Sequence, residues 1–132
     1  MDTPVEVSRK ERVLLVEDDT ILANLLTIQF QHHHMECVVA SSGEDALQFL
    51  KVDRDFCVIL LDLSLPGMDG FEVLSNIKNE PQTASIPVVI VSNFGQEKDI
   101  AWGEKLGAQK FINKVSAVPG DIVDAARAYC DR

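Results

Sequence analysis

Five short apolar runs alternate along the chain with longer segments of helical spacing, and this alternation limits the possible fold more than any other feature. The apolar runs are residues 13–16, 37–40, 58–61, 88–91 and 111–112. Three of them are unbroken and rich in β-branched residues, which is typical of parallel strands covered on both faces. The second run is flanked by polar residues, which favours a place near a sheet edge. The alternation predicts a parallel sheet with right-handed crossovers and helices on both faces.

Each segment between the runs carries signals for the start or end of a helix. The residues that give these signals are Asp19, Ser42 and Asp69 before the first three helices, Gly107 after the fourth (residues 96–106), and Pro119 in the fifth. In the first helix the spacing predicts one buried face, formed by Leu22, Leu25, Leu26 and Phe30. The chain is therefore expected to fold as one doubly wound α/β domain.

Length and charge agree with one domain that does not bind nucleic acid. A chain near 150 residues buries ~68–70% of its unfolded surface, so 132 residues allow an ordinary core. The 12 Lys+Arg and 21 Asp+Glu give a net charge of −9, which would repel a phosphate backbone. No apolar run approaches the ~18 residues needed to cross a bilayer, and the polar N-terminus does not resemble a secretory signal. We expect a cytoplasmic domain over residues 11–130, behind a loose polar extension at residues 1–10.

The cysteines and histidines favour structural interpretations. Cys37, Cys57 and Cys130 are too few and too scattered for a disulfide framework or a zinc site. We expect all three to be buried, reduced thiols in a reducing cytosol. The run His32–His34 is interpreted as the polar end of a helix and not as a metal site, because consecutive residues do not share a helix face.

Polar residues follow four of the apolar runs, directly or after one further residue. They are Glu17 and Asp18 after the first run, Asp62 after the third, Ser92 after the fourth and Lys114 after the fifth. In an open parallel sheet the carboxyl ends of the strands form the ligand-binding edge, so these side chains should converge. Clustered carboxylates repel one another unless a cation is supplied. That cation is Lys114 or a hard divalent ion such as Mg²⁺, which suits all-oxygen ligands.

Four separated motifs carry a family resemblance. The segments Val16–Asp19, Leu61–Gly70, Val91–Ser92 and Phe111–Lys114 resemble the receiver domain of two-component response regulators, and the resemblance covers residues 11–130. It implies a flavodoxin-like, five-stranded parallel sheet in the order 2-1-3-4-5. It also implies a domain that takes a phosphoryl group from the phosphohistidine of a histidine kinase or phosphotransfer protein. Beyond its own phosphorylation and dephosphorylation, such a domain is not an enzyme.

The resemblance assigns a role to each motif residue. Asp62 would be the phosphoacceptor, Ser92 would hydrogen-bond the phosphoryl group, and Lys114 would pair with Asp62 or the phosphoryl oxygens. The ligands of Mg²⁺, or alternatively Mn²⁺, would be Glu17, Asp18, Asp62 and the backbone carbonyl of Ser64. A carboxylate can accept a phosphoryl group as an acyl phosphate, and the reaction needs mainly positioning and charge neutralisation.

Three aromatic residues are expected to take part in activation, in partner binding or in the lifetime of the acyl phosphate. Phe111 stands where the family has an aromatic residue that changes rotamer on activation. With Trp102 it is expected on a partner surface formed by the fourth helix, fifth strand and fifth helix. Phe94 is expected to shield the acyl phosphate from water and to slow its hydrolysis. The chain departs from the family at Val115, where Pro is usual, which leaves the isomer of the Lys114–Val115 bond open.

Two alternative classes fit less well. A haloacid-dehalogenase-type phosphatase needs a nucleophilic Asp after the first strand, where this chain has Glu17. A flavodoxin-like FMN module needs a phosphate-cradling loop at the place that three acids occupy. The sequence leaves open the cognate kinase, the pathway, the output partner, the oligomeric state and whether an output domain follows Arg132.

Overall fold

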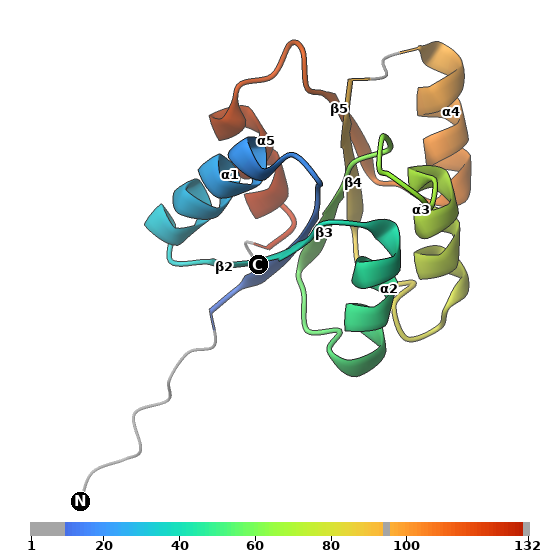
Figure 1. Ribbon diagram of the computed structural model, residues 1–132, viewed down its shortest axis with the longest axis horizontal. Coiled ribbons are helices and arrows are strands. Elements are labelled where there is room, and N and C mark those ends of the chain that lie inside the picture. Colours follow the sequence, from blue (N-terminus) through green and yellow to red (C-terminus); the bar gives the residue numbers. More distant parts are fainter. Residues whose placement is uncertain (1–9, 94–95, 131–132) are drawn as a thin grey trace, which may run out of the picture.

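The structure, a computed structural model, describes residues 10–93 and 96–130. Five parallel strands form one sheet in the order β2-β1-β3-β4-β5 (Figure 1). The strands are β1 (Arg12–Val16), β2 (Glu36–Ala40), β3 (Val58–Leu61), β4 (Val88–Ser92) and β5 (Lys110–Asn113). The helices are α1 (Thr20–His32), α2 (Gly43–Val52), α3 (Gly70–Asn79), α4 (Glu97–Leu106) and α5 (Pro119–Arg127). The predicted fold class and strand order are confirmed, and β2 lies at a sheet edge as expected.

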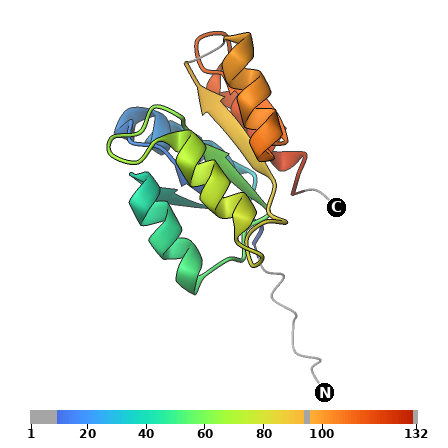
Figure 2. The ribbon, with the colours of Figure 1, turned by 90° about the vertical axis from the view of Figure 1, so that its right-hand side faces the viewer.

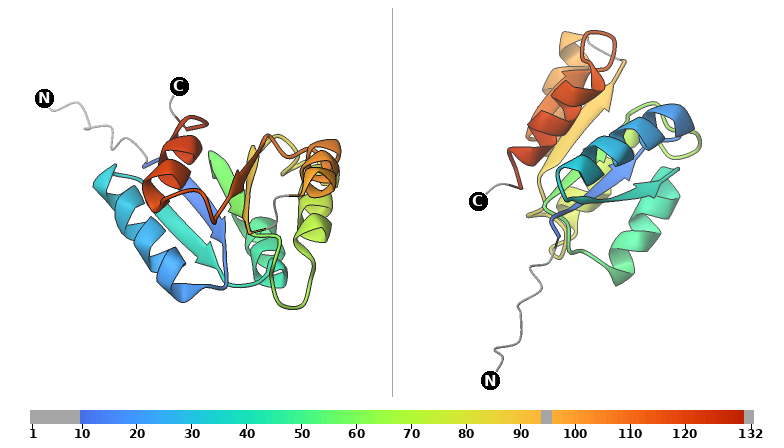
Figure 3. Two further views of the ribbon diagram at one scale, coloured as in Figure 1. Left: turned by 90° about the horizontal axis from the view of Figure 1, so that it is seen from above. Right: turned by 90° about the vertical axis from the view of Figure 1, so that its left-hand side faces the viewer.

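Helices cover both faces of the sheet. Helices α2, α3 and α4 lie in a row on one face (Figure 2), and α1 packs beside α5 on the other (Figure 3). Alternate residues of each buried strand therefore enter two separate cores. In β1, Val13 and Leu15 contact the α1–α5 side, whereas Leu14 and Val16 contact the α2–α4 side. This two-sided burial explains why the strands read as continuous apolar runs.

The predicted helix caps are present. The carboxylate of Asp19 accepts hydrogen bonds from the backbone N–H groups of Ile21 and Leu22 at the start of α1. The hydroxyl of Ser42 accepts one at α2, and the carboxylate of Asp69 accepts one at α3. Gly107 ends α4 in the left-handed region, with φ of 109°. The hydrogen bonds to Asp19, Ser42 and Asp69 satisfy N–H groups that have no partner within their own helix.

The predicted buried face of α1 is wrong at Leu25. The buried residues of this helix are Ala23, Leu26 and Phe30, whereas the side chain of Leu25 is 45% exposed. Apolar residues occupy most of the circumference of α1, so their spacing alone does not show which stripe meets the sheet. Ile21, Leu25 and Ile28 consequently form a second apolar stripe that faces solvent.

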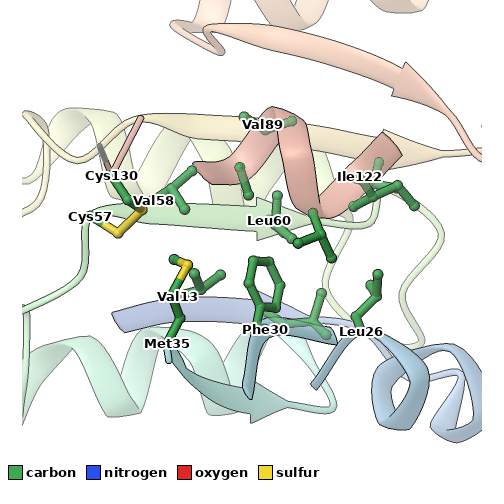
Figure 4. Close-up of a cluster of buried hydrophobic side chains, with 14 of the residues drawn as sticks. Val13, Leu26, Phe30, Met35, Cys57, Val58, Leu60, Val89, Ile122 and Cys130 are labelled. Atoms are coloured by element: carbon green, nitrogen blue, oxygen red, sulfur yellow. A yellow bond between two sulfur atoms is a disulfide. The ribbon is translucent and has the colours of Figure 1, made fainter. Parts of the chain in front are cut away.

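The expectation of three reduced cysteines is also wrong. Cys57 and Cys130 form a disulfide between residues 73 positions apart in the sequence, with a Cα–Cα distance of 5.1 Å (Figure 4). Both are buried, as expected, in the core on the α1–α5 side. The pairing escaped the sequence because only the tertiary fold brings the start of β3 to the end of α5. Cys37 is a free, half-buried thiol, and burial raises its pKa to about 11.

The three consecutive histidines lie at the end of α1. His32 ends α1, and His33 and His34 follow it, all three exposed. Residues 1–9 of the expected polar extension lie outside the described residues. Within residues 10–93 and 96–130, the helices are too short or too polar to cross a lipid bilayer.

Candidate functional site

The carboxyl ends of three strands bring the predicted site residues together. Glu17 and Asp18 directly follow β1, Asp62 directly follows β3, and Lys114 directly follows β5. The backbone N–H of Asp62 donates to the carbonyl of Val16 at 3.1 Å, which fixes the end of β3 beside the end of β1. The predicted convergence of acids and one ammonium is therefore present, and it follows from where the strands end.

Lys114 joins the two buried carboxylates. Its Nζ lies 3.0 Å from Asp62 Oδ2 and also donates to Glu17 Oε1. Glu17 is 3% exposed and Asp62 is 4% exposed, so water screens neither charge well. Asp18 stands beside them in an exposed position. Two buried acids thus share one cation, and with Asp18 beside them the site retains an excess of negative charge.

The charges at this site perturb one another. Burial, with a smaller contribution from the neighbouring Asp62, raises the pKa of Glu17 to about 7, although Lys114 opposes the shift. Burial alone would lower the pKa of Lys114, but its hydrogen bonds to Glu17 and Asp62 raise it. Lys114 therefore stays protonated, whereas Glu17 holds a proton more readily than an ordinary glutamate does.

The donor set fits a hard divalent cation. Glu17, Asp18 and Asp62 each offer a carboxylate oxygen, and these atoms lie within 4.8 Å of one another. All-oxygen donors suit Mg²⁺ or Mn²⁺, and an added divalent charge would offset the excess of negative charge. The backbone N–H of Ser64 donates to Asp62 Oδ1 at 2.9 Å. Ser64 therefore lies next to Asp62, while its carbonyl remains a predicted ligand.

The loop between β3 and α3 is held close to Asp62 by two residues to which sequence reasoning gave no role of their own. At Gly70, a Cβ would lie 2.5 Å from Leu63 Cα and 2.7 Å from the Asp62 carbonyl oxygen. Only glycine allows this approach without a shift of the backbone. From α2, Glu44 Oε1 accepts a hydrogen bond from the backbone N–H of Met68 at 2.9 Å. The motif around Gly70 was visible in the sequence, but the contact of Glu44 depends on tertiary packing.

The structure places two of the other predicted residues, Ser92 and Phe111, on β4 and β5. Ser92 ends β4, is fully buried, and its carbonyl accepts from the backbone N–H of Lys114 at 2.9 Å. Phe111 in β5 is half-buried and packs against the core on the α2–α4 side. Phe94 lies outside the described residues.

At the departure from the family, the Lys114–Val115 bond is trans, as are all peptide bonds of the described part. The Val115 side chain is 80% exposed. Its N–H donates to Asn113 Oδ1 at 2.8 Å, so an Asn side chain orders the loop after Lys114 where the family usually has Pro.

The arrangement has the parts that phosphoryl transfer to a carboxylate requires. A buried carboxylate lies beside a fixed ammonium, and two further acids offer ligands for a cation that would neutralise phosphoryl oxygens. Comparisons with known proteins identify the family. The family model of the response regulator receiver domain matches residues 13–127.

Individual proteins show the same similarity. Protein PilH of Pseudomonas aeruginosa is 30% identical over 103 residues, which cover 78% of this chain and 84% of PilH. A putative response regulator from Chloroflexus aurantiacus superposes with a TM-score of 0.84 at 25% identity, covering 94% of this chain and 100% of that one. The Mn²⁺-bound form of response regulator Rcp1 superposes with a TM-score of 0.76 at 28% identity, covering 89% and 90%.

The chain belongs to the response regulator receiver domain family of two-component systems. Several other curated relatives are longer proteins, and this chain spans between 22% and 48% of their length.

Proposed function

We propose that this receiver domain accepts a phosphoryl group on Asp62 in a reaction that requires Mg²⁺ or Mn²⁺. The donor is the phosphohistidine of a histidine kinase or phosphotransfer protein, and the reaction takes place in the cytoplasm. The observation that carries the proposal is the contact of buried Asp62 with Lys114 inside a cluster of three acids. Beyond its own phosphorylation and dephosphorylation, we assign no catalytic activity to the chain.

The charge of each side chain explains its role in the proposed phosphoryl transfer. A carboxylate oxygen of Asp62 attacks the phosphorus atom, the phosphorus–nitrogen bond of the donor phosphohistidine breaks, and the histidine imidazole leaves. Lys114 stabilises the negative charge on the transferred group. Glu17 and Asp18, with Asp62, would hold the metal, which supplies further positive charge to the phosphoryl oxygens. The buried Ser92 would hydrogen-bond the attached phosphoryl group, and its loop would move toward it.

Labelling with acetyl phosphate tests the proposal. The intact mass of the protein should rise by one phosphoryl group only when Mg²⁺ is present. Asp62→Asn should abolish the rise. Asp69→Asn is the matched control, because Asn caps a helix as well as Asp does and the α3 cap lies outside the acid cluster. Labelling of Asp62→Asn at the parental level would refute the assignment.

The exposed stripe of α1 is where we expect the phosphodonor to dock. Ile21, Leu25 and Ile28 are 74%, 45% and 51% exposed, and their spacing places them on one side of the helix. Helix α1 begins two residues after the metal ligand Asp18, so a partner lying on this stripe would reach the phosphoacceptor edge. The fitting partner is a helix with an apolar face, since two apolar stripes bury each other.

A charged substitution in the stripe separates docking from chemistry. Ile28→Lys should slow phosphotransfer from a phosphorylated histidine kinase that phosphorylates the parent, and it should leave labelling by acetyl phosphate unchanged. Gln31→Lys, at another exposed position of α1, is the control for added charge. Equal slowing with both donors would contradict a docking role.

The output surface is proposed on α4, β5 and α5. Trp102 on α4 is 46% exposed, and Val115 and Val118 in the loop after β5 are more exposed still. Phosphorylation would draw the loop after Ser92 inward and change the environment of α4. Adding Mg²⁺ with beryllofluoride, a phosphoryl mimic, should therefore change the fluorescence of Trp102, which is the only Trp in the chain. An unchanged spectrum and unchanged quenching would contradict coupling to α4.

A further inference from the structure

The disulfide lies at the end of β3 opposite the phosphoacceptor. Cys57 directly precedes β3, whereas Asp62 directly follows it, so the same strand separates the two groups. Cys130 follows the end of α5 at Arg127. Figure 4 shows the two sulfurs bonded at one end of the core on the α1–α5 side, next to Val58. This pair has no part in the site described above.

The surroundings of the sulfurs suit the reduced state as well. Cys57 Sγ lies 3.2 Å from the carbonyl oxygen of Arg12, in the geometry of a hydrogen bond donated by a thiol. Reduced cysteines are also well tolerated in an apolar core, where they behave as small hydrophobic residues. The other members of this core are buried without any covalent bond, and a domain of this size does not need one. The fold therefore accommodates both oxidation states.

We propose that Cys57 and Cys130 form a reversible thiol–disulfide site. A small-molecule disulfide such as oxidised glutathione oxidises the pair, and a dithiol reduces it. Reversibility rests in part on the proposed function, because disulfides of cytoplasmic proteins are usually transient or redox-sensing. Oxidation joins the residues after α5 to the start of β3, and reduction releases them.

The exchange takes place in two balanced steps. Cys57 is 8% exposed and Cys130 is 1% exposed, so the thiolate of Cys57 attacks first. It breaks the sulfur–sulfur bond of oxidised glutathione, forms a mixed disulfide and releases one glutathione thiolate. The thiolate of Cys130 then attacks the Cys57 sulfur and releases the second glutathione. Two protein thiols are oxidised, one glutathione disulfide is reduced to two thiols, and the two protons pass to the released thiolates.

Glu11 is placed to slow this exchange. Its side chain is exposed, and a carboxylate oxygen lies within 4.8 Å of both sulfurs. A nearby negative charge disfavours the thiolate, and the thiolate is the attacking species. Removing this charge should therefore speed oxidation of the pair.

Counting thiols tests the proposal on the full chain. The protein is equilibrated with mixtures of reduced and oxidised glutathione, acidified, and alkylated under denaturing conditions, and alkylated cysteines are counted by mass. Reduced protein should carry alkyl groups on Cys37, Cys57 and Cys130, and oxidised protein on Cys37 alone. Cys37→Ser should lose one group in both states, and Cys130→Ser should form no internal disulfide. Asp62→Asn should behave as the parent does, which separates this result from any failure of the phosphorylation proposal.

Two further measurements sharpen the test. Glu11→Gln should be oxidised severalfold faster than the parent at the same pH. Amide exchange of residues 128–130 should be severalfold faster in the reduced form than in the oxidised form, because Cys130 is then released from β3.

Three results would overturn the proposal. The pair could remain reduced in excess oxidised glutathione, or it could remain oxidised in excess dithiothreitol without denaturant, which would make it a fixed structural bond. The reduced protein could instead retain one zinc ion that blocks oxidation, which would make Glu11, Cys57 and Cys130 a metal site. An unchanged oxidation rate in Glu11→Gln would remove the role given to Glu11.

Discussion

At the scale of single residues, Lys114 is the charge on which the metal-free site depends. Its ammonium is the cation that two buried carboxylates share. Removing one partner of a buried ion pair leaves an uncompensated charge, which is more costly than the pair itself is stabilising. Lys114 therefore contributes both to the candidate site and to the stability of the metal-free fold.

Lys114→Ala should lower the free energy of unfolding by about 3–5 kcal/mol in metal-free buffer, because Glu17 and Asp62 would be buried without a counter-charge. Mg²⁺ should restore part of the loss, since it supplies the missing positive charge. Urea denaturation with and without MgCl₂ measures both effects. Lys105→Ala, on the surface of α4, should change stability by less than about 0.5 kcal/mol. A loss in Lys114→Ala no larger than in this control would contradict the account.

Glu17 should make metal-free stability fall as pH rises. Its pKa is raised in the folded state to about 7 from an ordinary value of 4.5. Between these values the folded state holds a proton that the unfolded state has lost, so the free energy of unfolding decreases with pH. Above about pH 7 the contribution is fully lost.

Urea midpoints measured without metal across this pH range provide the test. The decrease should be smaller in Glu17→Gln than in the parent, because the amide does not titrate. Mg²⁺ affinity of the parent should show the opposite trend and rise with pH, since the ion needs an ionised Glu17. Identical pH dependence of the parent and Glu17→Gln would exclude this residue as the origin.

At the scale of elements, the site depends on how tightly the β3–α3 loop closes on the end of β3. Gly70 begins α3 against the backbone of Leu63 and Asp62, and Glu44 of α2 holds the Met68 amide. The strand places Asp62, and these two contacts hold the loop through which Ser64 reaches it.

Gly70→Ala should disturb this closure. The added methyl group would overlap backbone atoms, and overpacking of this kind costs about 1–3 kcal/mol of stability. Labelling by acetyl phosphate should slow as well, because the loop must move away from Asp62. Gly120→Ala is the matched control in α5, where the nearest atom to a new Cβ is Gln29 Oε1 at 3.8 Å. It should be neutral or stabilising by up to about 1 kcal/mol, since Ala favours a helix over Gly. Equal behaviour of the two variants would argue against the close approach.

At the scale of the whole molecule, the disulfide ties the chain across 73 residues of sequence. Reduction should lower the free energy of unfolding by about 2–4 kcal/mol, because the unfolded chain regains the freedom that a long closed loop removes. Urea unfolding with and without dithiothreitol measures the difference. Cys37→Ser should retain it, whereas the double variant Cys57→Ala/Cys130→Ala should lose it. Coincident unfolding curves for the oxidised and reduced parent would contradict this prediction.

The features that could be predicted from the sequence are those that neighbouring residues determine. Glu17, Asp62 and Lys114 converge because each follows an apolar run, and the ends of parallel strands share one edge. The caps at Asp19, Ser42 and Asp69 are likewise local.

The features that escaped prediction are tertiary. Cys57 meets Cys130 only after α5 packs on the sheet, and the contact of Glu44 with Met68 joins two helical segments. The exposure of Leu25 escaped prediction because it depends on which of two apolar stripes of α1 meets the sheet. Periodicity could not decide between them, because both stripes have helical spacing.

The central claim is that Asp62 carries the phosphoryl group, and trapping the acyl phosphate tests it most directly. Borohydride reduces an aspartyl phosphate to homoserine, so treatment after labelling with acetyl phosphate and Mg²⁺ marks the acceptor permanently. Peptide sequencing by tandem mass spectrometry should find homoserine at position 62 and Asp at positions 18, 19 and 69. Homoserine at another position, or no homoserine in fully labelled protein, would contradict the account.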